Sequence, residues 1–203
     1  DAKEIAVFSA ASETFTQKNT NCSIEESINR LRPVLEKAQK NNIPVRGYIS
    51  CVLGCPYQGN VPVEDVVNLA VKMTEMGCFQ ISLGDTIGAG TPVQAKRMVQ
   101  KVSEKVPIPN LALHFHDTRG QALANIYACL ELGVSVIDAS VAGLGGCPYA
   151  KGATGNVATE DLVFMLNGME IETGIDLNKL IGTGRFISDV LGRLPQSRVS
   201  SAA

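Results

Sequence analysis

The sequence predicts an α/β fold and, within that class, part of a (β/α)8 TIM barrel. Five short apolar runs alternate with helical patterns at intervals of roughly 25 to 40 residues, which is typical of parallel βα units. Each run leads into polar or glycine-containing sequence: SAASETF, SCVLGCPYQG, SLGDTIGAG, HFHDTRG and AGLGGCPYAKG. In a barrel these loops converge on the face that holds the active site. An open doubly wound sheet fits the alternation too, but its G-x-G-x-x-G turn is missing.

The predicted strands are short and apolar, and they cover residues 4–10, 45–53, 79–83, 111–115 and 134–142. We expect them to be the fourth to eighth strands of the barrel. About three βα units, on the order of 90 residues, would then precede Asp1. Because five strands alone leave two unpaired edges, we expect the chain as it stands to be incomplete for activity.

Helices are predicted between the strands from their end signals. Ser23, followed by Glu26, is a capping box for the first helix, which Pro33 should kink. Pro62 fits the first turn of the next helix, and Gly77 would end it.

The second half of the chain carries similar signals. Thr91 predicts the start of a helix, and another covers residues 121–132. After the last strand, Thr159 should cap a helix and Asp176 should start one, while the polar tail at 196–203 is expected to fray.

The composition indicates one globular domain over residues 1–203, with barrel units over 1–168 and a C-terminal helical extension over 169–203. A net charge of -2 and the lack of a basic stripe argue against nucleic acid. No apolar run reaches the roughly 20 residues that a membrane helix needs, and the first residues do not resemble a secretory signal. The six cysteines have neither disulfide density nor paired zinc spacing, so we expect reduced thiols. The charge balance that argues against nucleic acid favours a small molecule as the partner.

The only two histidines, His114 and His116, are two residues apart at the end of a predicted strand. Side chains at i and i+2 point to the same side of a strand, so we expect the imidazoles to form a preformed pair of metal ligands. Two interior histidines satisfied by the protein itself are the alternative. Asn156 is a candidate oxygen ligand, although it could also be a turn residue. Nitrogen and oxygen donors of this kind suit Mg²⁺ or Mn²⁺.

The glycine-rich stretch VAGLGGCPYAKGATGN presents Cys147 between paired glycines and a proline. Such a loop can bring a thiol close to a ligand. Cys55 shares the Cys-Pro-Tyr context, and the residues alone leave the choice between the two thiols open. Asp85 ends a strand; it could act as a base, hold one, or cap its own loop.

These motifs together resemble the 3-hydroxy-3-methylglutaryl-CoA lyases, from EIAVFSAASETF and LHFHDTRGQALAN to GLGGCPYAKGATGN. They belong to a superfamily of metal-dependent barrels that also contains isopropylmalate and homocitrate synthases. The resemblance implies a divalent cation on His114, His116, Asn156 and an aspartate. It also implies that Cys147 works in proton transfer and that Asp85 is an acidic position tied to activity.

The implied reaction is cleavage of 3-hydroxy-3-methylglutaryl-CoA into acetyl-CoA and acetoacetate, a step in ketone-body formation and leucine breakdown. In the family, the aspartate ligand and a neighbouring catalytic arginine lie on the first barrel strand, with a further acidic residue on the second. Neither region is present in this sequence.

Two other functions are compatible with the sequence. One is a Claisen-type acyl transferase of the same superfamily, against which the Gly-Gly-Cys-Pro-Tyr loop argues. The other is an inactive, truncated paralogue that acts through association. The expected partners are an acyl-CoA substrate and a second copy of the chain in a dimer, without nucleic acid or membrane. The expected compartment is the cytoplasm of a bacterium or the mitochondrial matrix of a eukaryote.

Overall fold

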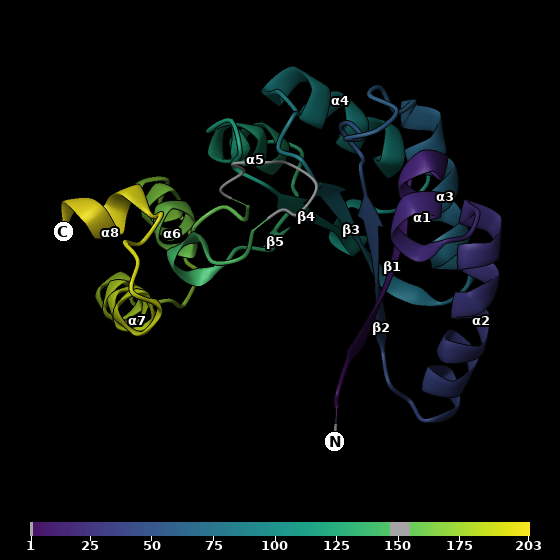
Figure 1. The fold of residues 1–203 in the computed structure, drawn as a ribbon, viewed down its shortest axis with the longest axis horizontal. Coiled ribbons are helices and arrows are strands. Elements are labelled where there is room, and N and C mark those ends of the chain that lie inside the picture. The colour runs from purple at the N-terminus through teal and green to yellow at the C-terminus, as the bar shows by residue number, and fades with distance from the viewer. Residues whose placement is uncertain (1, 147–154) are drawn as a thin grey trace.

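The computed structural model describes residues 2–146 and 155–203, and it contains one parallel sheet (Figure 1). Its strands lie in the order β1-β2-β3-β4-β5. They are β1 (Ile5–Ala10), β2 (Val45–Ser50), β3 (Cys78–Asp85), β4 (Leu111–Phe115) and β5 (Val136–Ile137). Strands that are neighbours in the sequence are neighbours in space, as in a barrel, whereas a doubly wound sheet reverses direction at a switch point. The predicted α/β class and the partial barrel are confirmed.

Two predicted strands end earlier than expected. β2 stops at Ser50 because Cys51 adopts a positive φ of 65°. β5 covers two residues of the predicted 134–142. Beyond it, the chain turns to form a second parallel pairing, in which the amide of Ser140 donates to Val157 (3.1 Å) and the amide of Thr159 donates back to Ser140 (2.9 Å). This pairing extends the parallel arrangement past β5.

Helices flank the strands: α1 (Glu13–Thr20), α2 (Ile24–Lys40), α3 (Val63–Glu75), α4 (Pro92–Ser103), α5 (Ala122–Leu130), α6 (Thr159–Gly168), α7 (Leu177–Leu191) and α8 (Arg198–Ala202), with 3-10 turns η1 (Ile108–Asn110) and η2 (Val141–Gly143). Figure 1 shows α6, α7 and α8 gathered at one end of the molecule, away from α1 and α2. The predicted caps at Ser23 and Asp176 are confirmed, since each side chain accepts a first-turn amide. Pro33 lies within α2, and the kink predicted there stays a prediction.

Two predictions about helix ends are wrong. Thr159 does not cap α6 but is its first residue, following Ala158. The tail at 196–203 does not fray among the described residues, because it forms α8 and is anchored to α6. The hydroxyl of Ser197 donates to Asp161 (2.6 Å), whose carboxylate also accepts the amide of Val199 (2.9 Å).

The two faces of the sheet differ in chemistry. The outer face carries apolar side chains that are fully buried under the helices, such as Ile49, Leu83 and Leu113. The inner face carries the alternate residues, including Arg46 and His114. Arg46 of β2 is paired with Gln80 of β3, and His114 of β4 is paired with Gly84 of β3. A barrel strand alternates in this way, with its outer side chains packed against helices and its inner ones available for chemistry.

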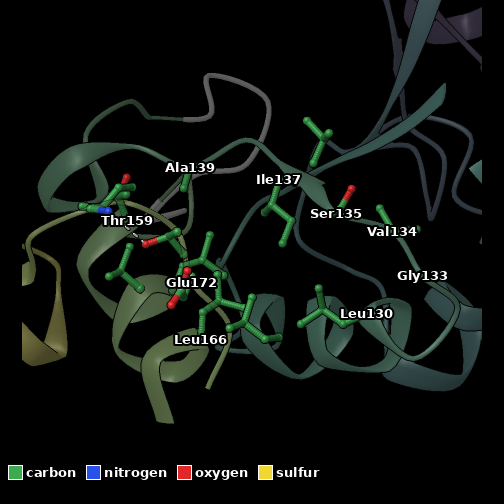
Figure 2. Close-up of a pocket in the computed structure, with 15 residues that line it drawn as sticks. Leu130, Gly133, Val134, Ser135, Ile137, Ala139, Thr159, Leu166 and Glu172 are labelled. Carbon is green, nitrogen blue, oxygen red and sulfur yellow. Dashed lines mark hydrogen bonds between the residues drawn. The ribbon is translucent and has the colours of Figure 1, made fainter. Parts of the chain in front are cut away.

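The outer face of β5 is the least covered. Only the turn η2 follows β5 among the described residues up to Gly146, so a cavity of about 720 Å³ lies between β5, α5 and α6 (Figure 2). Its lining is mainly aliphatic, with Leu130, Ile137 and Leu166 around it. It contains neither histidine and lies on the opposite side of the sheet from them. In the described part of the chain, no helix has the length and apolarity to cross a membrane.

A buried carboxylate joins α6 to η2. Glu160 is completely buried, and both of its oxygens lie 2.9 Å from the amide of Ala142, which has a positive φ of 55°. Gly184 of α7 packs directly on this carboxylate, so a Cβ at residue 184 would collide with Oε1 of Glu160. The contact therefore requires glycine on α7.

We predict that Gly184→Ala lowers the free energy of unfolding by roughly 1–3 kcal/mol, because the new methyl group displaces the Glu160 carboxylate. The control is Gly182→Ala, in the same helix but with open space around it, which should stabilise by up to about 1 kcal/mol. Urea unfolding curves measure both changes. Equal effects of the two substitutions would contradict the packing argument.

Candidate metal and catalytic site

The two histidines lie side by side on the inner face. His114 is in β4 and His116 follows its last residue, and their ring centroids are 5.4 Å apart with an interplanar angle of 54°. The i, i+2 spacing predicted this arrangement. Nδ1 of each ring is buried; among the described residues Nδ1 of His116 has no hydrogen-bond partner, and Nδ1 of His114 has only Asp138 at 3.5 Å. Buried ring nitrogens without partners are consistent with a ligand-binding role.

Asn156 reaches the same place through the backbone. It forms an antiparallel bridge with His116, and the adjacent amide of Asp117 donates to Gly155 (2.8 Å). The side-chain amide of Asn156 donates to the carbonyl of Leu144 (3.0 Å), which leaves its carbonyl oxygen as the acceptor. The chain thus gathers the three predicted ligands, two nitrogens and one oxygen, at one end of the sheet.

The chemistry of this donor set fits a divalent cation only with further oxygen ligands. Among the described residues, no group of three or more His, Cys, Asp or Glu side chains is placed to hold a metal. Any cation bound by the histidines therefore depends on Asn156 and on donors outside this group.

The surroundings of His116 keep its ring neutral at neutral pH. The pKa of His116 is lowered to about 4, first because burial disfavours the charged ring and second because a charge on His114 would repel it. A neutral imidazole can donate its lone pair to a metal, so His116 is ready for that role at neutral pH.

Asp85 lies at the same end of the sheet, but its carboxylate points into its own loop. The side chain is completely buried, and its oxygens accept the amides of Ala89 (3.0 Å) and Gly90 (2.8 Å). Burial raises the pKa of Asp85, although the amides of Gly90 and Ala89 act in the opposite direction. The contacts favour the loop-capping alternative of the sequence analysis.

The loop that Asp85 holds packs against the histidine strand. Gly88 in this loop has a positive φ of 56°, and a Cβ there would come within 2.7 Å of the carbonyl of His116. Arg119 donates to the carbonyls of Ile87 (2.9 Å) and Gly88 (3.0 Å). Asp85 can therefore influence the site by fixing the loop against His116.

The predicted thiol Cys147 lies outside the described residues. Cys55, the alternative, is only 3% exposed. Burial alone would raise the pKa of Cys55, but hydrogen bonds, mainly from the Gln58 amide and the Ser12 hydroxyl, lower it. The remaining described cysteines are buried and unoxidised, as expected of small apolar residues: Cys22, Cys51, Cys78 and Cys129.

Sequence reasoning missed a polar network next to His114. Asp138, just after β5, accepts hydrogen bonds from Arg46 of β2 (2.7 Å) and from Ser82 of β3 (2.8 Å). Its Oδ2 lies 3.5 Å from Nδ1 of His114. Arg46 also donates to the hydroxyl of Tyr48 (2.9 Å), whose ring meets His114 edge-on at a centroid distance of 5.8 Å. Four strands or their ends thus contribute to one buried cluster.

This network sets the charge state of its carboxylate. Burial by itself would raise the pKa of Asp138, but contacts with His114, Ser82 and Arg46 hold it below its ordinary value. One signal could have revealed the network: Arg46 and Asp138 are opposite charges placed in two otherwise apolar strand segments.

We predict that Arg46→Met destabilises the protein by about 3–5 kcal/mol, because it leaves a mostly buried carboxylate without its cation. The matched control is Lys96→Met, which breaks the Lys96–Glu131 ion pair at the surface and should cost at most about 1 kcal/mol. Chemical denaturation measures both. Similar losses for the two variants would show that burial does not distinguish the pairs.

Comparison with known proteins shows the family of the chain. The HMGL-like family model matches residues 1–187. The mitochondrial hydroxymethylglutaryl-CoA lyase of Gallus gallus is 61% identical over 202 residues, which are 100% of this chain and 68% of that protein. A hydroxymethylglutaryl-CoA lyase structure from Pseudomonas aeruginosa superposes with a TM-score of 0.97 at 57% identity, covering 98% of this chain and 67% of that one.

A third relative was solved with ligands. The lyase structure from Acinetobacter baumannii, in complex with coenzyme A and 3-methylmalate, has a TM-score of 0.94 at 36% identity and covers 99% of this chain and 66% of that one. The chain thus spans about two thirds of the length of these relatives. A family match over most of the residues and high identity to several lyases lead to one conclusion: the chain belongs to the HMGL-like family.

Proposed function

We propose that the protein carrying this chain is a carbon-carbon lyase that cleaves 3-hydroxy-3-methylglutaryl-CoA into acetyl-CoA and acetoacetate. The observation that carries the proposal is the pair of imidazoles 5.4 Å apart beside Asn156, in a chain 61% identical to a lyase of that name. The coenzyme A bound to the Acinetobacter relative supports an acyl-CoA substrate.

The reaction divides into proton movements and one bond cleavage. The substrate's tertiary hydroxyl loses its proton, the carbon-carbon bond breaks to leave a carbonyl on acetoacetate, and the bonding electrons pass to the thioester side. The acetyl-CoA enolate then takes a proton. Atoms and charge balance with no external oxidant or reductant, so acid-base groups and charge stabilisation suffice.

We assign the binding of a divalent cation, Mg²⁺ or Mn²⁺, to His114, His116 and Asn156. Their donor atoms suit such an ion, and the two histidine rings lie side by side on the inner face of the sheet, with centroids 5.4 Å apart. A bound cation would lower the pKa of the substrate hydroxyl and stabilise negative charge on oxygen.

The other two site residues act on protons and on position. We assign proton transfer to the thiol of Cys147, whose neighbours Gly145 and Gly146 permit close approach to a substrate. For Asp85 we propose a positioning role, since its buried carboxylate holds the loop at residues 86–90 against the His116 backbone. Its removal would then alter the site without removing a group that touches substrate.

The proposed reaction places the protein in leucine breakdown and ketone-body formation. The related lyases include mitochondrial, cytoplasmic and bacterial proteins. We accordingly propose the mitochondrial matrix if the source is eukaryotic and the cytoplasm if it is bacterial, with a dimer as the working assembly.

We predict that His114→Ala, made in the complete protein, lowers acetoacetate release more than about 100-fold and weakens Mn²⁺ binding, because one ligand of the cation is lost. Enzymatic assay of acetoacetate and Mn²⁺ titration provide the two readouts. Tyr127→Ala, at a 48% exposed ring on α5, is the control and should change neither. Near-normal metal content and rate in the His114 variant would remove the ligand assignment.

We predict a different pattern for Cys147→Ala. The rate should fall about 10²- to 10⁴-fold, as for loss of a proton-transfer group, while Mn²⁺ binding stays at the wild-type level. The acetoacetate assay and the Mn²⁺ titration measure these two effects. If Cys147→Ala lost activity and Mn²⁺ binding to the same extent, the thiol would be structural. Separately, if the wild-type protein consumed acetyl-CoA together with a keto acid, the acyl-transferase function would be favoured.

A further inference from the structure

We propose that Asp138 is a positioning residue for His114: its carboxylate accepts the Nδ1 proton, so that Nε2 of His114 carries the free lone pair. The proposal rests on the proposed function only in that His114 is taken as a metal ligand. The contact between Asp138 and His114 is visible without any ligand.

The first argument is that His114 has one acidic neighbour. Oδ2 of Asp138 is 3.5 Å from Nδ1, and no other carboxylate of the described residues lies within 4.0 Å of either histidine ring. This distance is at the outer limit of a hydrogen bond. Because Nδ1 is buried, solvent water cannot accept its proton, and the Asp138 carboxylate is the nearest acidic acceptor among the described residues.

The second argument is that Asp138 is itself held in place. Arg46 binds Oδ1 at 2.7 Å, and the Ser82 hydroxyl binds Oδ2 at 2.8 Å, so both oxygens have a fixed donor. The Ser82 bond falls on the oxygen that faces His114. The carboxylate therefore cannot rotate to present a different acceptor without losing one of these bonds.

The third argument concerns the ring of His114. The Tyr48 ring packs edge-on against it, at a centroid distance of 5.8 Å and an angle of 82°. Tyr48 is in turn stacked on Phe8, with centroids 4.8 Å apart. With Asp138 on one nitrogen and Tyr48 against the ring, the orientation of His114 is set from two sides. Carboxylates that bind the second nitrogen of a ligating histidine orient it and strengthen it as a ligand.

The two histidines differ in a way that makes the proposal testable. His116 has no carboxylate within 4.0 Å among the described residues, and its nearest aromatic neighbour is His114 itself. A change at Asp138 should therefore affect His114 and spare His116. The two histidines of this chain contribute four ring-nitrogen signals, and His114→Ala and His116→Ala variants assign them.

The test is Asp138→Asn in the ¹⁵N-labelled, metal-free protein, with long-range ¹H–¹⁵N spectra recorded at about pH 8.5, well above the ordinary histidine pKa near 6.5. In the wild type, His114 should carry its proton on Nδ1. In the variant the tautomer should shift toward Nε2–H, while His116 stays unchanged. Mn²⁺ affinity should fall roughly 10- to 100-fold. Asp65→Asn, an exposed residue of α3, is the matched control and should alter neither readout.

Ser82→Ala keeps the charge at Asp138 and serves where Asp138→Asn does not fold. It removes the donor that fixes the orientation of Oδ2 toward His114, so it should shift the tautomer and the affinity in the same direction but less. An unchanged His114 tautomer in the folded variant overturns the proposal. Separately, if Mn²⁺ fails to broaden the His114 and His116 signals of the wild type, the metal assignment fails. The tautomer of His114 in the Asp138 variant still tests the positioning role of Asp138.

Discussion

The ion pair between Arg46 and Asp138 is the contact on which the shape of the inner face depends. The two residues are 92 positions apart in sequence and belong to β2 and to the end of β5, with β3 and β4 between them. Strands three places apart in a flat sheet lie roughly 14 Å from each other. The 2.7 Å bond between the two side chains is favoured by a sheet that curves toward its inner face, as a barrel sheet does.

The same curvature explains why the chemistry collects where it does. Residues on the concave side converge, so Ser82 and His114 on the intervening strands fall between the two charges. The cluster is partly buried, so its polar groups have less water to bind and need partners in the protein or in a ligand. The Asp138 carboxylate is satisfied by Arg46 and Ser82, whereas Nε and Nη2 of Arg46 are buried without a hydrogen-bond partner among the described residues.

The strands and the histidine pair could be predicted because they depend on local patterns. Apolar runs and end signals predict both ends of β4 correctly. The alternation of side chains along a strand is enough to place His114 beside His116. The Arg46–Asp138 pair could not be found this way, because it depends on curvature across four strands. The predictions for β5 and for the tail at α8 failed for a similar reason. These segments are fixed by hydrogen bonds that they donate to Val157 and Asp161, which are distant in sequence.

The placement of Asn156 follows from how its segment is closed. The described flanks of that segment meet twice, through the pairing of Ser140 with Val157 and Thr159 and through the bonds from Ala142 to Glu160. Ordering a loop costs entropy that grows slowly with its length, so joining the two flanks removes much of the freedom of Asn156. The bridge from Asn156 to His116 then fixes the remaining direction. Glu160 thus acts on the proposed metal site from α6 without touching it, because it determines where the chain returns to the histidines.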